Sequence, residues 1–204
     1  MTRLFVDARE VPFPAGVNCS LDQILRHVEL TELPPDSAIR QVHIDGAAVL
    51  EECSASSGLD QREKIEVFTS SLGDIARESI SEANSYLDRV QTVIPALSKS
   101  FQDLPGPQAF ENLRQLCDGF YWLNLLLDRL GKTFHRPQQE TLVQGLSISK
   151  QNQRLLTIFR ELVEAQERKD FLLISDLLEY EIMPFLPVWK EMLAAIGTDS
   201  VSSS

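Results

Sequence analysis

Hydrophobic and polar positions change their period once along the chain, close to residue 70. Before that point apolar residues alternate over short runs such as RLFVD (3–7), AREVPF (8–13) and EKIEVFTS (63–70), a spacing that predicts strands. SLDQILRHVEL (20–30) differs, because its apolar residues follow a helical spacing behind a possible N-cap at Ser20, and Pro34 and Pro35 end the element.

A β-hairpin is the strongest local signal in this first part. IRQVHIDGAAVL (39–50) alternates on both sides of Asp45-Gly46, a dipeptide suited to a type I′ turn. The predicted order over residues 1–70 is therefore β-β-α-β-β-β.

This length and order resemble the β-grasp (ubiquitin-like) fold. Two uses of that fold, conjugation and sulfur transfer, depend on an exposed C-terminal Gly-Gly. Here the last strand runs on into TSSLGDIARESI (69–80) without one, so neither activity is expected.

From residue 72 the period is helical. Two long seams with 4-3 spacing predict helices on either side of the LPGPQ break at 104–108, with Pro95 inside the first. FYWLNLLL (120–127) is apolar almost all round and predicts a central buried helix. HRPQQETLVQGLSIS (135–149) is predicted to be a loop, followed by helices from about Ser149 and over Lys169–Leu193. The seams are Ala76, Ile80, Ala83, Leu87, Val90, Ile94, Leu97, Phe101 and Leu104, then Leu113, Leu116, Phe120, Leu123, Leu127, Leu130 and Phe134.

The predicted fold class is thus α+β: a β-grasp-like module over 1–70, an antiparallel four-helix bundle over 72–197, and a disordered tail over 198–204.

Composition and charge exclude several classes of partner and binding site. The formal net charge is −11 and no cluster of Lys and Arg is visible, which argues against nucleic acid and against an anionic membrane as partners. No apolar run approaches the length of a membrane span, and no signal peptide is evident, so a cytoplasmic protein is expected. Cys19, Cys53 and Cys117 lie far apart, which argues against a zinc site. A Cys19–Cys53 disulfide stays open, although the missing secretory signal disfavours it.

The final helix carries the least expected pattern. On a helical wheel its core seam takes Phe171, Ile174, Leu178, Ile182, Phe185, Trp189, Met192 and Ile196. Asp176 and Glu179 lie on the back face with Leu172, Leu173, Tyr180 and Met183, while Glu181 flanks the seam. This back face is too apolar to meet only water, so Leu172, Asp176, Glu179, Tyr180 and Met183 are predicted to form an interface with the N-terminal module, a second copy or a partner protein.

Catalysis is not indicated. A di-iron bundle needs inward Glu-x-x-His pairs, and His27, His43 and His135 all lie outside the predicted bundle helices. No Gly-rich phosphate loop and no nucleophile–base pair appears. We therefore expect no cofactor, no metal and no enzyme activity.

DLLEYEIMP (Asp176–Pro184) resembles a D-L-L-E-Y-E-x-x-P signature of uncharacterised bacterial proteins that join a small β-rich N-terminal part to a helical bundle. That group has no known function, so no catalytic residue follows from the resemblance. The first hypothesis is a non-catalytic adaptor or chaperone that binds a protein partner, or itself, through the bundle surface. Two alternatives are a ligand-binding, metal-binding or enzymatic bundle using Asp176, Glu179, Tyr180 and Glu181, and an export chaperone of a secretion or flagellar apparatus.

Overall fold

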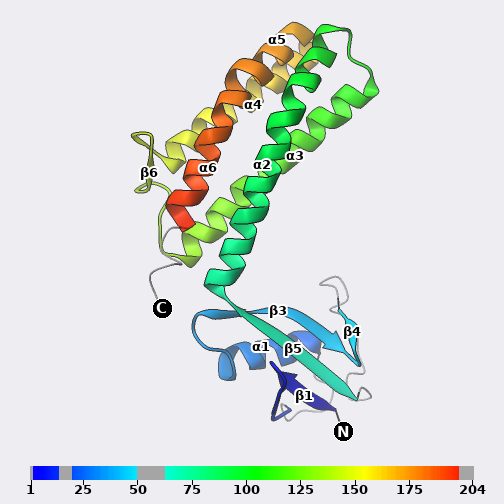
Figure 1. The fold of residues 1–204 in the computed structure, drawn as a ribbon, viewed down its shortest axis with the longest axis vertical. Helices are drawn as coiled ribbons and strands as arrows, with labels where there is room; N and C mark the ends of the chain where they lie inside the picture. Colours follow the sequence, from blue (N-terminus) through cyan, green and yellow to red (C-terminus); the bar gives the residue numbers. More distant parts are fainter. Residues whose placement is uncertain (1, 14–19, 50–62, 198–204) are drawn as a thin grey trace. The chain divides into compact units, whose positions relative to one another are not determined.

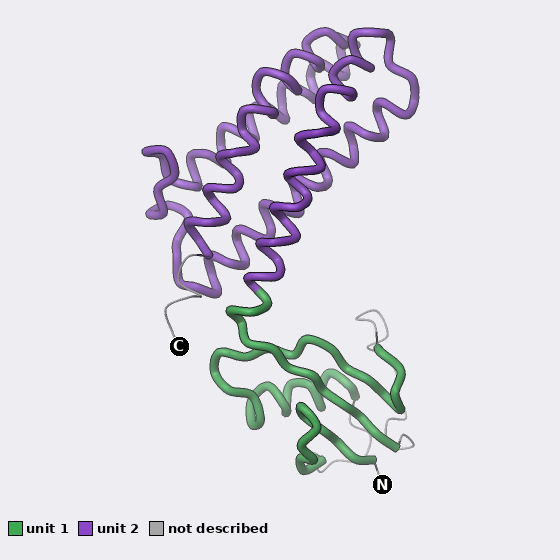
Figure 2. The backbone as a smooth tube through the Cα atoms, viewed as in Figure 1, with its two compact units in different colours: residues 1–75 green, residues 76–204 purple. Residues whose placement is uncertain are grey.

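The computed structural model describes residues 2–13, 20–49 and 63–197. The protein is α+β and divides into two compact units, residues 1–75 and 76–204 (Figure 2). The predicted tail over 198–204 lies outside the described residues, as do Cys19 and Cys53.

The first unit holds a five-stranded mixed sheet and one helix in the predicted order (Figure 1). The strands are arranged β2-β1-β5-β3-β4, and β1 runs parallel to β5 while the other pairs are antiparallel. The elements are β1 (Arg3–Val6), β2 (Arg9–Val11), α1 (Leu21–Thr31), β3 (Ser37–Ile44), β4 (Ala47–Ala48) and β5 (Lys64–Ser71).

Period-two burial places one face of this sheet against α1. Leu4, Ile65 and Val67 of the central strands are buried with Ile24 and Val28 of the helix. Because alternate residues of a strand point to opposite faces, the alternation of apolar and polar residues places the apolar ones together on the face that packs against α1.

Local signals in the first unit are confirmed. The Ser20 hydroxyl oxygen accepts a hydrogen bond from the Gln23 backbone N–H, and Gln23 Oε1 accepts one from the Ser20 backbone N–H, forming a capping box. At the hairpin, Asp45 (φ 51°) and Gly46 (φ 83°) both have positive φ, as a type I′ turn requires. The Asp45 carboxylate also accepts from the N–H groups of Glu63 and Lys64, which fixes the start of β5.

The second unit is helical. Its elements are α2 (Leu72–Gln102, beginning in the first unit), α3 (Pro107–Thr133), β6 (Leu142–Val143), β7 (Leu146–Ser147), α4 (Ile148–Arg168), α5 (Phe171–Asp176), the π-helical segment η3 (Leu177–Ile182) and α6 (Met183–Gly197). No helix among the described residues combines the length and the apolar character that crossing a bilayer requires.

The predicted seams form one continuous core. Leu87, Ile94, Leu123, Leu127 and Trp189 are each fully buried in it. Leu104 departs from its seam, because it lies in the turn after α2 with φ 66° and is 85% exposed. The 4-3 pattern therefore ends one turn earlier than the sequence suggests.

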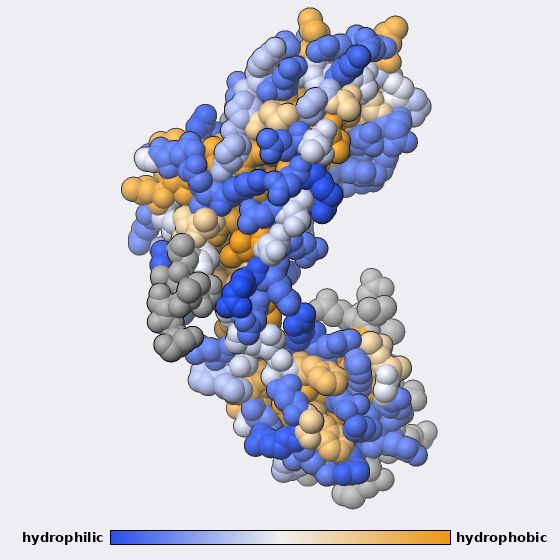
Figure 3. Space-filling view, viewed as in Figure 1, coloured by the Kyte–Doolittle hydropathy of each residue, from blue (hydrophilic) through white to orange (hydrophobic). Residues whose placement is uncertain are grey.

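The prediction that FYWLNLLL (120–127) marks a central buried helix is wrong. Tyr121, Trp122 and Leu125 are partly or largely exposed, although Phe120, Leu123 and Leu127 are buried. Among the described residues, the helix is therefore covered on its seam side and leaves other apolar side chains at the surface. On the face of this unit that Figure 3 shows, hydrophilic residues make up most of the surface, and hydrophobic residues are visible between them.

The segment predicted as a loop over 135–149 contains a short hairpin, β6–β7. Its turn residues Gln144 and Gly145 both have positive φ, so this Gln-Gly pair acts like the Asp-Gly pair of the first unit. Ser147 then caps α4 by accepting from the Lys150 N–H. The helix thus begins at Ile148, close to the predicted Ser149.

Candidate functional site

The final helix is the first candidate surface, and it is not one regular helix. Its middle, η3, is π-helical, and the Met183 N–H donates to the Leu178 carbonyl five residues back. Ile174, Leu178 and Ile182 are all buried before and within this segment. A π turn holds more residues than an α turn, so the residues after it are rotated relative to a regular helical wheel.

The extra residue in this turn separates the predicted back face into different environments. Leu172 and Tyr180 are 63% and 66% exposed, and Asp176 is exposed as well. Met183 is instead half-buried and packs against the core, because it follows the π segment. Glu181, predicted beside the seam, is exposed.

Glu179 faces a buried polar cluster. Ser98 of α2 and Ser175 of α5 are almost fully buried, and their hydroxyl oxygens lie 2.8 Å apart. The Gln102 side-chain amide donates to Ser175 Oγ at 2.8 Å, and Ser98 Oγ lies within 3.3 Å of the Glu179 carboxylate. These contacts join the final helix to α2.

A metal site does not follow from these carboxylates. Among residues 2–13, 20–49 and 63–197, no group of three or more His, Cys, Asp or Glu side chains is placed to hold an ion. Within this region the cluster is two hydroxyls, an amide and one carboxylate, which is a hydrogen-bonded helix contact. Whether Leu172, Asp176, Glu179, Tyr180 and Met183 act as an interface stays a prediction.

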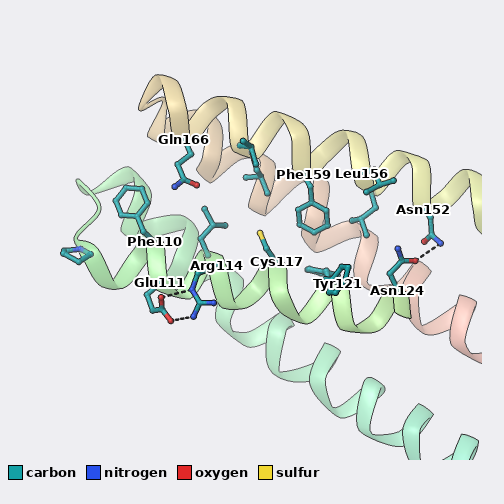
Figure 4. A pocket seen from close by; sticks show the side chains of 16 residues that line it. Phe110, Glu111, Arg114, Cys117, Tyr121, Asn124, Asn152, Leu156, Phe159 and Gln166 are labelled. Atoms are coloured by element: carbon teal, nitrogen blue, oxygen red, sulfur yellow. Dashed lines mark hydrogen bonds and ion pairs between the residues drawn. The ribbon is translucent and has the colours of Figure 1, made fainter. Parts of the chain in front are cut away.

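A second candidate surface is a groove between α3 and α4. Its volume is about 590 Å³, within the range of ligand and peptide sites. Figure 4 shows side chains of both helices facing it, with Cys117 and Phe159 near its middle. The lining includes Phe110, Leu113, Arg114, Cys117, Phe120, Tyr121 and Asn124 of α3, and Asn152, Leu155, Leu156, Phe159, Leu162, Val163 and Gln166 of α4.

Packing elsewhere leaves this groove open. In the described helices α3 packs against α6, and α4 packs against α5 and η3. Phe120 contacts both Phe159 and Trp189 across the floor. Above this floor Tyr121, Leu156 and Val163 remain 67%, 49% and 56% exposed.

Polar groups lie at one end of the groove and along its α3 side (Figure 4). At the end the Asn152 amide donates to Asn124 Oδ1 at 3.0 Å and to Gln138 Oε1 at 3.1 Å. Along α3, between Phe110 and Cys117, Arg114 pairs with Glu111 at 2.7 Å and with Asp118 at 2.6 Å. Hydrogen bonds from Arg114 and Gln115 lower the pKa of Glu111 to about 2.

The chemistry of the groove is that of a binding surface. Burial, with a smaller contribution from Asp118, raises the pKa of the Cys117 thiol to about 11, so it is protonated at neutral pH and a poor nucleophile. The described lining contains no histidine that could act as its base.

Sequence reasoning missed this groove. On α4 the residues at core spacing, Leu155, Ile158, Phe159 and Leu162, are all buried or half-buried. Leu156 and Val163 lie seven residues apart, so they share a second apolar face beside that seam. Together with Tyr121 on α3, this outward i, i+7 pair was the available signal.

Comparison with known proteins gives a family without a function. A family model described as a domain of unknown function (DUF8042) matches residues 78–192, which lie within the helical unit. The expectation of an uncharacterised family is confirmed to that extent. No curated protein and no solved structure matches the chain.

Proposed function

The chain belongs to the DUF8042 family, whose description assigns no activity, and on that premise we propose that it is a non-catalytic protein-interaction protein of the adaptor or chaperone type. The matched region lies in the helical unit, so we place the binding function there. The partner is a protein, and the binding surface is the α3–α4 groove.

The observation that carries this proposal is the exposed apolar lining of the groove. Three apolar side chains of the lining are about half exposed or more, although they lie beside Phe120 and Phe159, which form the floor of the groove. They are Tyr121, Leu156 and Val163. Continuous apolar surface of this sort, bordered by polar residues, is typical of protein-binding sites.

We also propose finer structural assignments. The strand order β2-β1-β5-β3-β4 with a parallel β1–β5 pair supports a β-grasp module for the first unit. The four long helical segments, with α5, η3 and α6 counted as one, support a four-helix bundle for the second. The DLLEYEIMP segment, including the π turn, supports membership of a bacterial subgroup as a working hypothesis.

The alternative is a ligand-binding or enzymatic bundle centred on the final helix. It is favoured by the π-helical turn next to the buried Ser98–Ser175 pair, because π turns are frequent at functional sites. This alternative places the important surface at Asp176 and Tyr180 and makes the α3–α4 groove dispensable.

Affinity capture with paired variants tests the proposal. We would compare the wild-type chain, a groove variant with Leu156→Asp and Val163→Asp, and a control variant with Leu172→Asp and Tyr180→Asp. All four positions are exposed, so each pair should leave the fold intact, as checked by circular dichroism. We expect the groove variant alone to lose a captured protein. Loss from the final-helix variant alone would move the protein-binding surface to Leu172 and Tyr180, and equal capture by all three would refute a groove function.

A further inference from the structure

The α3–α4 groove has the length of a short helix. On α3 its lining runs from Pro107 to Asn124, which is eighteen residues and therefore about 25 Å at 1.5 Å per residue. A compact small molecule would fill only part of that length. An α-helix of about 17 residues would follow the groove from end to end and could place apolar side chains at i, i+3, i+4 and i+7 on the lining.

One end of the groove carries an acceptor without a donor. Asn152 uses its amide N–H₂ group to reach Asn124 and Gln138, but its Oδ1 atom is buried and has no hydrogen-bond partner. A buried acceptor in this state is unfavourable, so a rotation of the Asn152 amide that brings Oδ1 to an N–H or O–H group of an occupant would be favoured.

Charge favours a basic occupant. The formal net charge of the chain is −11. Glu111 and Arg114 line the groove as an ion pair, and Asp118, which pairs with the same Arg114, adds a second negative charge beside the lining. An acidic helix would be repelled by this field, whereas Lys or Arg side chains beside its apolar stripe would be attracted.

We propose that the groove binds a cationic amphipathic helix of about 17 residues from a partner protein, with its apolar stripe on Phe159, Leu156 and Tyr121 and a donor side chain at Asn152 Oδ1. This inference rests on the proposed protein-binding function and specifies the class of partner.

Cys117 supplies an internal reporter, because it lines the middle of the groove. The experiment uses the full chain with Cys19→Ser and Cys53→Ser, so that alkylation by N-ethylmaleimide reports on Cys117 alone. The probe is a synthetic amphipathic peptide of about 18 Leu and Lys residues arranged at helical spacing. The controls are a scrambled peptide of the same composition and a Leu/Glu peptide with the same spacing.

We expect the Leu/Lys helix to slow Cys117 alkylation by at least about tenfold at saturation, since the reaction needs access to the thiolate. The two control peptides should have little effect. Fluorescence anisotropy should show binding that weakens by about tenfold or more in the Leu156→Asp/Val163→Asp variant, because charge in an apolar contact is costly. The Leu172→Asp/Tyr180→Asp variant should bind as the wild type does.

Four results would overturn the inference. They are no protection by the Leu/Lys helix, equal protection by the scrambled peptide, equal protection by the Leu/Glu helix, and a concentration-dependent dimer that buries Cys117 without peptide. If the capture experiment locates a partner at the groove while the Leu/Lys helix gives no protection, the proposed function stands and the helical occupant is wrong. If capture is unaffected by groove variants, the proposed function itself fails.

Discussion

Gly119 offers a sharp test of how α2 and α3 approach each other. A Cβ atom at this position would overlap the hydroxyl and Cζ atoms of Tyr86 and would lie 2.9 Å from its Cε2. Tyr86 is half-buried, donates to the Leu116 carbonyl at 3.4 Å, and meets Trp122 edge to face at a centroid distance of 6.0 Å. Gly119→Ala must therefore displace an aromatic ring.

Two effects of opposite sign decide the outcome. Alanine in place of a mid-helix glycine stabilises by about 1 kcal/mol through backbone entropy. Displacing Tyr86 costs about 1–3 kcal/mol for overpacking, and losing its aromatic contact costs about 0.5–1.5 kcal/mol more. We expect Gly119→Ala to lower the free energy of unfolding by about 1–3 kcal/mol net.

The same substitution should change sign when Tyr86 is removed. In a Tyr86→Ala background there is no ring to displace, so Gly119→Ala should stabilise by up to about 1 kcal/mol. With a gain of about 1 kcal/mol there, the coupling between the two sites would be about 2–4 kcal/mol. Urea titration followed by tryptophan fluorescence measures this, because Trp122 and Trp189 both lie in the helical unit. A stabilising Gly119→Ala in the wild-type background, or equal effects in both backgrounds, would refute the predicted contact.

Three further predictions concern the core, the groove thiol and metals. Leu123→Ala, at a fully buried position, should cost about 2–5 kcal/mol in urea titration, whereas Leu142→Ala at an exposed one should change stability by less than about 0.5 kcal/mol; a small effect at Leu123 would mean that the core is misplaced. The alkylation rate of Cys117 should keep rising through pH 9 towards about 11, because burial keeps the thiol protonated; a half-maximal rate near pH 9, the value expected for an unperturbed thiol, would contradict this. A chelator should leave the melting temperature unchanged, since three His and three Cys without ligand spacing give little basis for a structural metal, and a drop of more than a few degrees would show otherwise.

Much of the core could be predicted from the sequence. The seams place Leu87, Ile94 and Leu123 inside because residues three and four apart share one face of a helix. Ser20 and Asp45-Gly46 were identified for the same kind of reason, since their capping and turn geometry is decided by a few neighbouring residues.

The exposure of Tyr121, the π turn and the role of Gly119 could not be predicted, because each depends on tertiary contacts with other segments of the chain. The exposure of Tyr121 follows from the absence of a helix over that side of α3 in the described chain, which its own sequence does not state. The π turn is not visible in the apolar spacing, because Ile174, Leu178 and Ile182 also share one face of a regular α-helix, and a wheel drawn at a constant angle misplaces Met183 beyond it. Gly119 likewise acquires its role only through Tyr86, thirty-three residues away.

Site-specific photocrosslinking distinguishes a binding surface at the α3–α4 groove from one on the final helix. The photoreactive amino acid p-benzoylphenylalanine would replace either Tyr121 or Tyr180, which are 67% and 66% exposed and lie on the two competing surfaces. If the groove binds the partner, irradiation in the native cell should yield a discrete crosslinked protein from position 121 and none from position 180. A discrete product from position 180 alone would contradict it and would place the binding surface on the final helix.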